Sequence, residues 1–328
     1  MRVLVVRFSS IGDIVLTTPV VRALHRQLGA EVHVVVKKAF APIWEANPYV
    51  RRVHAMERHI GELIPDLRRQ RFDYVADLHK NLRSLHLRLA LRRPGRAFPK
   101  LNFRKWLLTT FKWNVLPDVH IVHRYFEAVR PLGAHYDGEG LDWFFPEGQV
   151  QDAAAFGLEP GRYVAFAIGA AHATKRLPFG KMEAICRLLQ RPVALLGGPA
   201  EADTGERLAR TAGPHVHNLC GKTTLHGSAR VLEQAGAVLT HDTGMMHIAA
   251  ALRKSIVSVW GNTVPAFGMY PFYPDGAGIP SRIFEVRDLS CRPCSKIGYD
   301  RCPKGHFHCM ERLDAAEIAA AVETLMPR

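Results

Sequence analysis

The stretch RFSSIGDIVLTTP, residues 7–19, decides how this chain is interpreted. It follows an apolar run, VLVV at residues 3–6, and leads into a helical pattern that ends at Gly29. Nucleotide-binding α/β domains place a G-x-G-x-x-G loop between such a strand and helix, because its glycines let the backbone approach a pyrophosphate. This stretch has one glycine, Gly12, and beside it a carboxylate, Asp13, which would repel a pyrophosphate.

Asp13 has two interpretations, both of which follow from its place at the start of a helix. A carboxylate there is stabilised by the helix dipole and the free amides, so Asp13 fits a helix cap. A carboxylate that faces a ligand also fits a general base. The hydroxyls of Ser9, Ser10 and Thr17 are placed to cap the helix, to bond the carboxylate or to touch a substrate.

The composition is that of a globular protein with room for two domains. The chain has 328 residues, of which 48% are hydrophobic and 23% are charged. No apolar run approaches the roughly 18 residues of a membrane helix, and the N-terminus lacks the apolar region of a signal peptide. We therefore expect a cytoplasmic protein.

Positive charge is concentrated in one segment. The formal net charge is +14, and residues 68–112 hold 13 Lys or Arg against two Asp or Glu. Such a patch suits nucleic acid, an anionic membrane surface or an acidic substrate. The aromatic and basic stretch FRKWLLTTFKW, residues 103–113, favours a membrane surface or an anionic substrate. Leu82, Leu85 and Leu89 share one helical face, which we predict packs on the domain core.

Strand-like and helical segments alternate along the chain in two series, separated by a less regular stretch at residues 94–146. The first series contains the strands RVLVVRF, EVHVVVK and FDYVADLH, and the second contains RYVAFAIG, PVALLGG, AVLTHD and SIVSVWG. Short apolar runs between helices are typical of parallel strands buried on both faces. The pattern predicts two doubly wound α/β domains that meet near residues 148–161, with ligands bound outside the carboxyl ends of the strands.

Two loops of the second domain carry polar residues directly after predicted strands. The loop AAHATKRLP places Thr174, Lys175 and Arg176 before the next helix, and its two cations can neutralise a diphosphate. The segment THDTGMMHIAAAL, residues 240–252, joins a buried strand to a helix whose free amides suit a phosphate. Taken singly, the loops also fit a solvated basic loop and a capped helix. Together they favour a nucleotide site.

These residues also carry a resemblance to a known family. The segments RFSSIGDIVLTTPVVRAL and LTHDTGMMHIAAAL resemble the two signature segments of family 9 glycosyltransferases, the ADP-heptose:lipopolysaccharide heptosyltransferases and their relatives. The resemblance implies a GT-B fold, with two Rossmann-like doubly wound domains facing across a cleft. Residues 1–152 would form the acceptor-binding domain and residues 153–328 the nucleotide-sugar-binding domain. The last helix, at about residues 312–326, would pack back on the first domain.

The resemblance also implies a chemistry. The chain would be an inverting, metal-independent glycosyltransferase that needs no cofactor for catalysis. It would move a heptose-like sugar from a nucleotide diphosphate donor, ADP-heptose, to a lipopolysaccharide core acceptor, with Asp13 as general base. The donor would be held by Thr174, Lys175, Arg176, Asp242, Thr243, Gly244 and His247. The acceptor would contact Ser9, Ser10, Gly12 and Thr17.

An anionic, lipid-linked acceptor would bring the protein to the inner face of the cytoplasmic membrane, where transient contact with the membrane surface is expected. Two other functions stay open. A sugar-nucleotide epimerase or hydrolase of GT-B shape would turn over the donor without an acceptor. A nucleic-acid-binding protein would use the net charge, but the chain has no recognised nucleic-acid-binding motif. The chain departs from many family members at His241, Thr243 and Leu177, which bears on donor preference.

Four of the six cysteines fall within nineteen residues, in the pattern C-x2-C-x7-C-x6-C. They are Cys291, Cys294, Cys302 and Cys309. The spacing is not one of the standard zinc-site spacings, so plain thiols or a redox-sensitive local bridge are favoured over a structural zinc site. No base lies beside them in the sequence to activate a nucleophile, and we expect a structural role.

Overall fold

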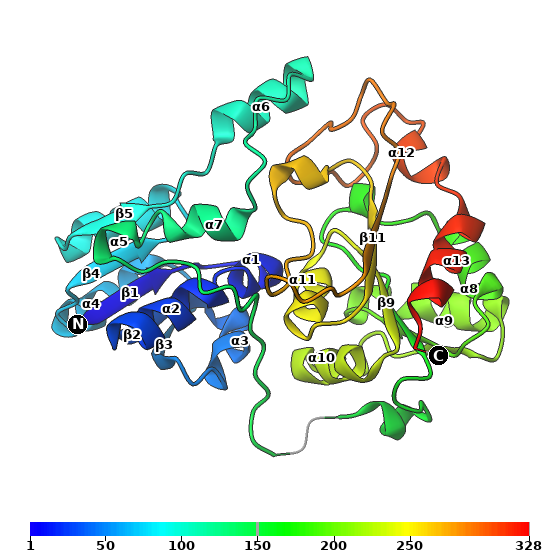
Figure 1. The fold of residues 1–328 in the computed structure, drawn as a ribbon, viewed down its shortest axis with the longest axis horizontal. Helices are drawn as coiled ribbons and strands as arrows, with labels where there is room; N and C mark the ends of the chain where they lie inside the picture. Colours follow the sequence, from blue (N-terminus) through cyan, green and yellow to red (C-terminus); the bar gives the residue numbers. More distant parts are fainter. Residues whose placement is uncertain (149–150, 328) are drawn as a thin grey trace. The chain divides into compact units, whose positions relative to one another are not determined.

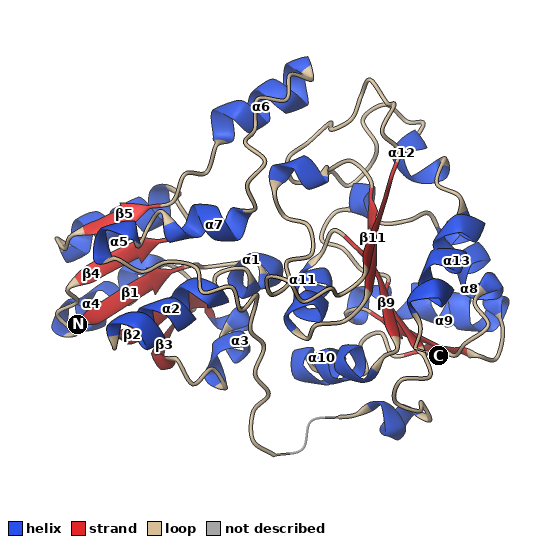
Figure 2. Cartoon of the chain, viewed as in Figure 1, coloured by secondary structure: helices blue, strands red, loops and turns tan. Residues whose placement is uncertain are grey.

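The computed structural model describes residues 1–148 and 151–327 and divides the chain into two compact units. Unit 1 comprises Met1–Leu101, Val119–Glu147 and Pro274–Gly276. Unit 2 comprises Asn102–Asp118 and the described residues of Gly148–Tyr273 and Ala277–Arg328. Figures 1 and 2 show a sheet with helices around it in each unit.

Unit 1 contains a five-stranded parallel sheet in the order β3-β2-β1-β4-β5. Its strands are β1 (Arg2–Val6), β2 (Glu31–Lys37), β3 (Val50–Met56), β4 (Tyr74–Asp77) and β5 (Gly95–Ala97). Its helices are α1 (Ile11–Val15), α2 (Thr18–Leu28), α3 (Pro42–Glu45), α4 (Ile64–Arg69), α5 (Leu82–Leu91) and α7 (Ile121–Phe126).

The order of this sheet reverses at β1. The chain runs from β1 through β2 to β3 on one side, and then returns to place β4 on the other side of β1. Ligands of open parallel sheets bind at such a switch point, outside the carboxyl ends of the two strands. The loops that begin at Arg7 and at Leu78 therefore mark the expected site of unit 1.

Unit 2 contains a six-stranded parallel sheet in the order β11-β10-β9-β6-β7-β8. Its strands are β6 (Val164–Ala167), β7 (Val193–Leu196), β8 (Val216–Asn218), β9 (Ala237–His241), β10 (Ile256–Trp260) and β11 (Ser281–Glu285). Its helices are α6 (Asn102–Phe111), α8 (Phe179–Leu188), α9 (Ala202–Ala212), α10 (Leu225–Gln234), α11 (Gly244–Ala251), α12 (His308–Glu311) and α13 (Ala315–Leu325). The switch point lies between β6 and β9.

The last helix, α13, begins where the sequence indicates. Asp314 Oδ1 accepts hydrogen bonds from the amides of Ala316 (2.7 Å) and Glu317 (3.3 Å), which is a helix cap. The helix packs against α8, β9 and β10 and buries Ile318 and Val322 in the core of unit 2. Ile318 and Val322 of this helix thus pack within unit 2.

Two features of the basic segment differ from the sequence-based expectation. Residues 102–118 belong to unit 2, where Lys112 Nζ donates hydrogen bonds to the carbonyls of Pro293 (2.8 Å) and Cys291 (3.4 Å). The prediction that Leu82, Leu85 and Leu89 face the core is wrong, because all three are exposed.

Candidate active-site residues

The carboxylate of Asp13 is held at both of its oxygens. Oδ1 lies 2.6 Å from Arg7 Nη2, and Oδ2 accepts a hydrogen bond from the hydroxyl of Ser10 at 2.9 Å. Asp13 and Ser10 also form a capping box at the start of α1, so the cap interpretation is confirmed. The Asp13 side chain nevertheless stays 22% exposed, which leaves the carboxylate accessible to a ligand proton.

Arg7 is the anchor of this arrangement. Its side chain is buried, and it donates hydrogen bonds to the carbonyls of Ser9 (2.9 Å) and Leu78 (2.6 Å), which tie the loop after β1 to the end of β4. Burial opposes its charge, but Asp13, Tyr125 and Asp77 together outweigh burial, and the pKa of Arg7 is raised. A permanent cation beside a carboxylate favours the ionised form, which is the form that accepts a proton.

His79 is a candidate that the sequence interpretation missed. It follows β4 at the switch point of unit 1, where Asp77 Oδ1 accepts the backbone amides of His79 (3.0 Å) and Lys80 (2.7 Å). Burial, assisted by the charge of Arg7, lowers the pKa of His79 to about 3, so its ring is neutral at physiological pH. Its Nδ1 is buried and has no hydrogen-bond partner among the described residues. The sequence signal that could have identified His79 is its position just after a buried strand.

The other loop residues named from the sequence differ in what they offer. Ser10 is exposed and Ser9 is half-buried, with its carbonyl occupied by Arg7. Gly12 is buried within α1. Thr17 is fully buried and donates its hydroxyl to the carbonyl of Ile14 at 2.6 Å. Thr17 therefore has a structural role, and its side chain is not available to an acceptor.

Lys175 and Asp242 connect the two loops at the switch point of unit 2. Lys175 Nζ lies 2.6 Å from Asp242 Oδ2 and 3.3 Å from the Asp242 carbonyl oxygen. The same Oδ2 accepts the hydroxyl of Thr263 at 2.8 Å, which adds the loop after β10. Asp242 is thus an orienting group for Lys175, whose side chain remains 17% exposed.

Thr174 is buried and belongs to the framework of this loop. Its hydroxyl lies 3.0 Å from Asn262 Oδ1 and accepts the amide of Tyr299 at 2.8 Å. The adjacent Arg176 is the more accessible cation, with a side chain 37% exposed and 3.5 Å from a carboxylate oxygen of Glu201. Of the three residues that the sequence analysis grouped, Thr174 therefore contributes a buried hydroxyl, whereas Lys175 and Arg176 are cations that can bind an anion.

The start of α11 offers backbone donors. Thr243 is the N-cap residue, and its side chain makes no capping hydrogen bond to the first turn. Gly244 begins the helix, so its first-turn amides can approach an anion closely. His247 is buried in the second turn. His241 is also buried, its Nε2 accepts the amide of Leu177 at 3.0 Å, and burial lowers its pKa to about 4.

The four clustered cysteines are thiols in this structure. Burial raises the pKa of Cys294, and it raises the pKa of Cys309 to about 12. Cys291 Sγ lies 3.8 Å from His306 Nε2. Across residues 1–148 and 151–327, no three His, Cys, Asp or Glu side chains are grouped to hold a metal ion. None of the helices in that part of the chain is long and apolar enough to cross a membrane.

Comparison with known proteins gives one consistent result. The model of glycosyltransferase family 9 (heptosyltransferase) matches residues 60–296. Lipopolysaccharide heptosyltransferase 1 of Pseudomonas aeruginosa is 30% identical over 326 residues, which cover 90% of this chain and 86% of that protein.

Solved structures agree with that result. The E. coli ADP-heptose lps heptosyltransferase II has a TM-score of 0.72 at 21% identity and covers 99% of this chain and 98% of its own. E. coli heptosyltransferase WaaC with ADP-2-deoxy-2-fluoro heptose has a TM-score of 0.62 at 25% identity, covering 88% and 94%. The expected GT-B fold of two Rossmann-like domains is confirmed.

Proposed function

The chain belongs to glycosyltransferase family 9, the heptosyltransferases, and on that premise we propose that it moves heptose from ADP-heptose to a lipopolysaccharide core acceptor. Family membership makes it a glycosyltransferase of lipopolysaccharide synthesis. Beyond family membership, we propose the identity of the donor nucleotide, the inversion of configuration at the anomeric carbon and the role of each residue. Support for the donor comes from WaaC, whose solved complex contains an ADP-2-deoxy-2-fluoro heptose.

Asp13 is the general base of the proposed reaction. It takes the proton of an acceptor hydroxyl, and the oxygen attacks the anomeric carbon of the donor sugar. The bond between that carbon and the diphosphate breaks on the opposite face, so the configuration inverts and ADP leaves. The observation that carries this role is the pairing of the partly exposed Asp13 carboxylate with the buried cation Arg7.

Unit 2 supplies the charge stabilisation in this proposal. Negative charge grows on the departing diphosphate, and a metal-independent enzyme must meet it with cations and amides. Lys175 is oriented by Asp242, and Arg176 lies beside it on the same loop. The first-turn amides of α11 complete the set. Thr174 and Asp242 act here by holding the loops rather than by touching the donor.

A lipopolysaccharide precursor is anionic and lipid-linked, so we propose that Ser9, Ser10 and Gly12 line the acceptor side and that the protein contacts the inner membrane surface transiently. Support for membrane contact comes from four exposed aromatic rings on and after α6. They form a continuous series, Phe103 to Trp106 to Phe111 to Trp113, with ring centroids 5.2–5.8 Å apart.

An ADP-release assay tests the reaction class. Purified protein is mixed with ADP-heptose, with and without heptose-deficient lipopolysaccharide, in the presence and absence of a metal chelator. The proposal expects ADP release that requires the acceptor and is unaffected by the chelator. Release from the donor alone would identify a hydrolase instead, and loss of release with the chelator would overturn the metal-independent mechanism.

A further inference from the structure

Helix α5 presents an apolar stripe to solvent. Leu82, Leu85 and Leu89 are 84%, 45% and 67% exposed, and their spacing places them on one face of the helix. A contiguous exposed stripe of large apolar side chains on a folded unit is a mark of an interaction surface.

The orientation of α5 is fixed by its opposite face. Ser84 donates its hydroxyl to Asp77 Oδ2 at 2.8 Å, and Asn81 caps the helix by accepting the amide of Ser84 at 2.9 Å. Leu87 and Leu91 lie on the same face as Ser84 and are buried in the core of unit 1. Because these contacts hold one face on the sheet, the leucine stripe must point outward.

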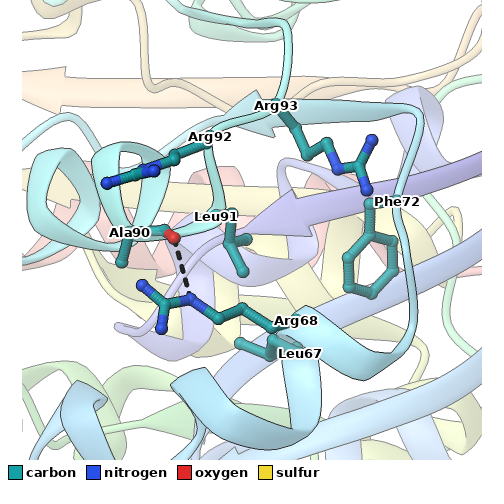
Figure 3. A pocket seen from close by; sticks show the side chains of 7 residues that line it. All are labelled: Leu67, Arg68, Phe72, Ala90, Leu91, Arg92 and Arg93. Atoms are coloured by element: carbon teal, nitrogen blue, oxygen red, sulfur yellow. Dashed lines mark hydrogen bonds between the residues drawn. The ribbon is translucent and has the colours of Figure 1, made fainter.

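Arginines surround the end of this helix. A cavity of about 340 Å³ is lined by Arg68 of α4, by Arg92 and Arg93 at the end of α5, and by the apolar side chains of Leu67, Phe72 and Leu91. Figure 3 shows Arg68 reaching from α4 to the carbonyl of Ala90, a hydrogen bond of 3.0 Å, with Arg92 and Arg93 on the α5 side. None of the three arginines has an acidic partner within residues 1–148 and 151–327.

We infer that the leucine stripe of α5 and the exposed arginines at the end of this helix form one docking surface for an anionic phospholipid bilayer. Arg92 is the C-cap residue of α5 and Arg93 follows it, so two exposed cations stand at the end of the helix, three and four residues after Leu89. Leucines enter the boundary of the acyl chains while arginines bind the headgroup phosphates. The inference rests on the proposed lipid-linked acceptor for its setting, and it names the surface of unit 1 that meets the membrane.

Charge complementarity favours the bilayer over other partners. A second copy of the chain would bring the same three arginines, Arg68, Arg92 and Arg93, against themselves. A nucleic acid would match the arginines but would leave the three leucines in water. An anionic bilayer satisfies both, since its phosphates are negative and its interior is apolar.

Vesicle binding by the full-length protein tests the surface without any transfer reaction. Vesicles of phosphatidylethanolamine and phosphatidylglycerol are compared with vesicles of phosphatidylcholine alone. One variant combines Leu82→Gln, Leu85→Gln and Leu89→Gln, which keep helix propensity, and a second combines Arg92→Gln and Arg93→Gln. Matched controls are Leu188→Gln on α8 and Arg210→Gln on α9, where the same residue types are exposed in unit 2.

The wild type and both controls should bind the phosphatidylglycerol vesicles and bind phosphatidylcholine weakly. The leucine variant should bind at least about ten-fold more weakly. The arginine variant should lose about five-fold for each arginine, and its residual binding should respond less to salt. Transfer to a deacylated, lipid-free acceptor should be unchanged in both variants, which separates this surface from the chemistry at Asp13.

Wild-type binding by both variants would overturn the inference, as would equal wild-type binding to the two kinds of vesicle. A concentration-dependent dimer that only the leucine variant loses, with vesicle binding intact, would assign the stripe to a second copy of the chain. Preferential, salt-sensitive binding of an oligonucleotide over the anionic vesicles would likewise replace the bilayer as the partner.

Discussion

The guanidinium of Arg7 and the carboxylate of Asp13 lie 2.6 Å apart, and this ion pair joins the end of β1 to the first turn of α1. Arg7 also holds the carbonyl of Leu78 beyond β4, so one buried cation fixes the proposed base to both strands of the switch point. An isolated capping carboxylate would need no such support, because the helix amides alone stabilise it.

Replacing Arg7 should impair the chemical step more than acceptor binding. Arg7→Met removes the cation and the orientation of Asp13, so kcat should fall by about 10–100-fold with a smaller change in the acceptor KM. Arg7→Lys keeps the charge but loses the planar set of donors, and should recover part of kcat. Steady-state kinetics with a thermal-unfolding control measure both. An unchanged kcat in folded Arg7→Met would show that the ion pair serves the fold alone.

His79 should act through a neutral ring. We expect His79→Gln to retain most of the activity, because an amide preserves hydrogen bonding, and His79→Leu to lose about ten-fold in kcat/KM for the acceptor. Because the pKa of His79 lies near 3, the wild-type rate profile should show no step from this histidine between pH 5 and 8. Equal activity of the two variants would exclude His79 from the site.

The pair of Lys175 and Asp242 should control nucleotide affinity. Lys175→Met removes a charged contact to the diphosphate and should weaken ADP binding by about 10–100-fold. Asp242→Asn leaves the ammonium without its orienting carboxylate and should weaken binding less. Calorimetry with ADP, UDP, GDP and CMP gives these affinities and tests nucleotide choice at once. Preference for a nucleotide other than ADP would overturn the ADP-heptose donor while leaving glycosyl transfer intact.

Stability should fall on acidification because of buried histidines in unit 1. His54 Nε2 lies 2.9 Å from His33 Nδ1, and burial lowers the pKa of His54 to about 4. Its pKa in the unfolded chain is about 6.5, so between these values the unfolded state binds more protons and stability rises with pH. The free energy of unfolding should drop by roughly 1–3 kcal/mol from pH 7 to pH 4.5.

Denaturant titrations at several pH values measure this effect. His54→Gln should flatten the profile, whereas His86→Gln, an exposed histidine on α5, should leave the slope unchanged. A free energy of unfolding that increases from pH 7 to pH 4.5 would contradict this prediction.

The sequence predicted the architecture well, since long apolar runs and strand-end loops reflect burial along the chain. It placed Asp13, Lys175 and Asp242 after the strands that turn out to flank the two switch points. It did not predict β3, β5 or β11. β5 is a short edge strand of three residues, and β3 and β11 carry charged, exposed side chains, so none shows a continuous apolar run.

Side-chain orientation was harder to predict. Helix α5 has leucines on two faces, and the face that meets the sheet is the one with Ser84, whose hydroxyl donates to Asp77, and with the buried Leu87 and Leu91. Thr174 and Thr17 carry hydroxyls of the kind that contact ligands. The Thr174 hydroxyl instead accepts the amide of Tyr299, and the Thr17 hydroxyl donates to the carbonyl of Ile14. These side-chain orientations depend on hydrogen bonds to residues distant in the sequence or to backbone carbonyls. The hydrophobic periodicity of the sequence does not predict such bonds.

The most direct test of the account is heptose transfer by Asp13→Asn. The variant keeps the size and the capping capacity of the side chain but cannot accept the proton, so we predict that acceptor-dependent ADP release falls by about 10²–10⁴-fold. ADP affinity, measured by calorimetry, should stay at the wild-type value. Near-full transfer by a folded Asp13→Asn protein would contradict the assignment of Asp13 as the general base.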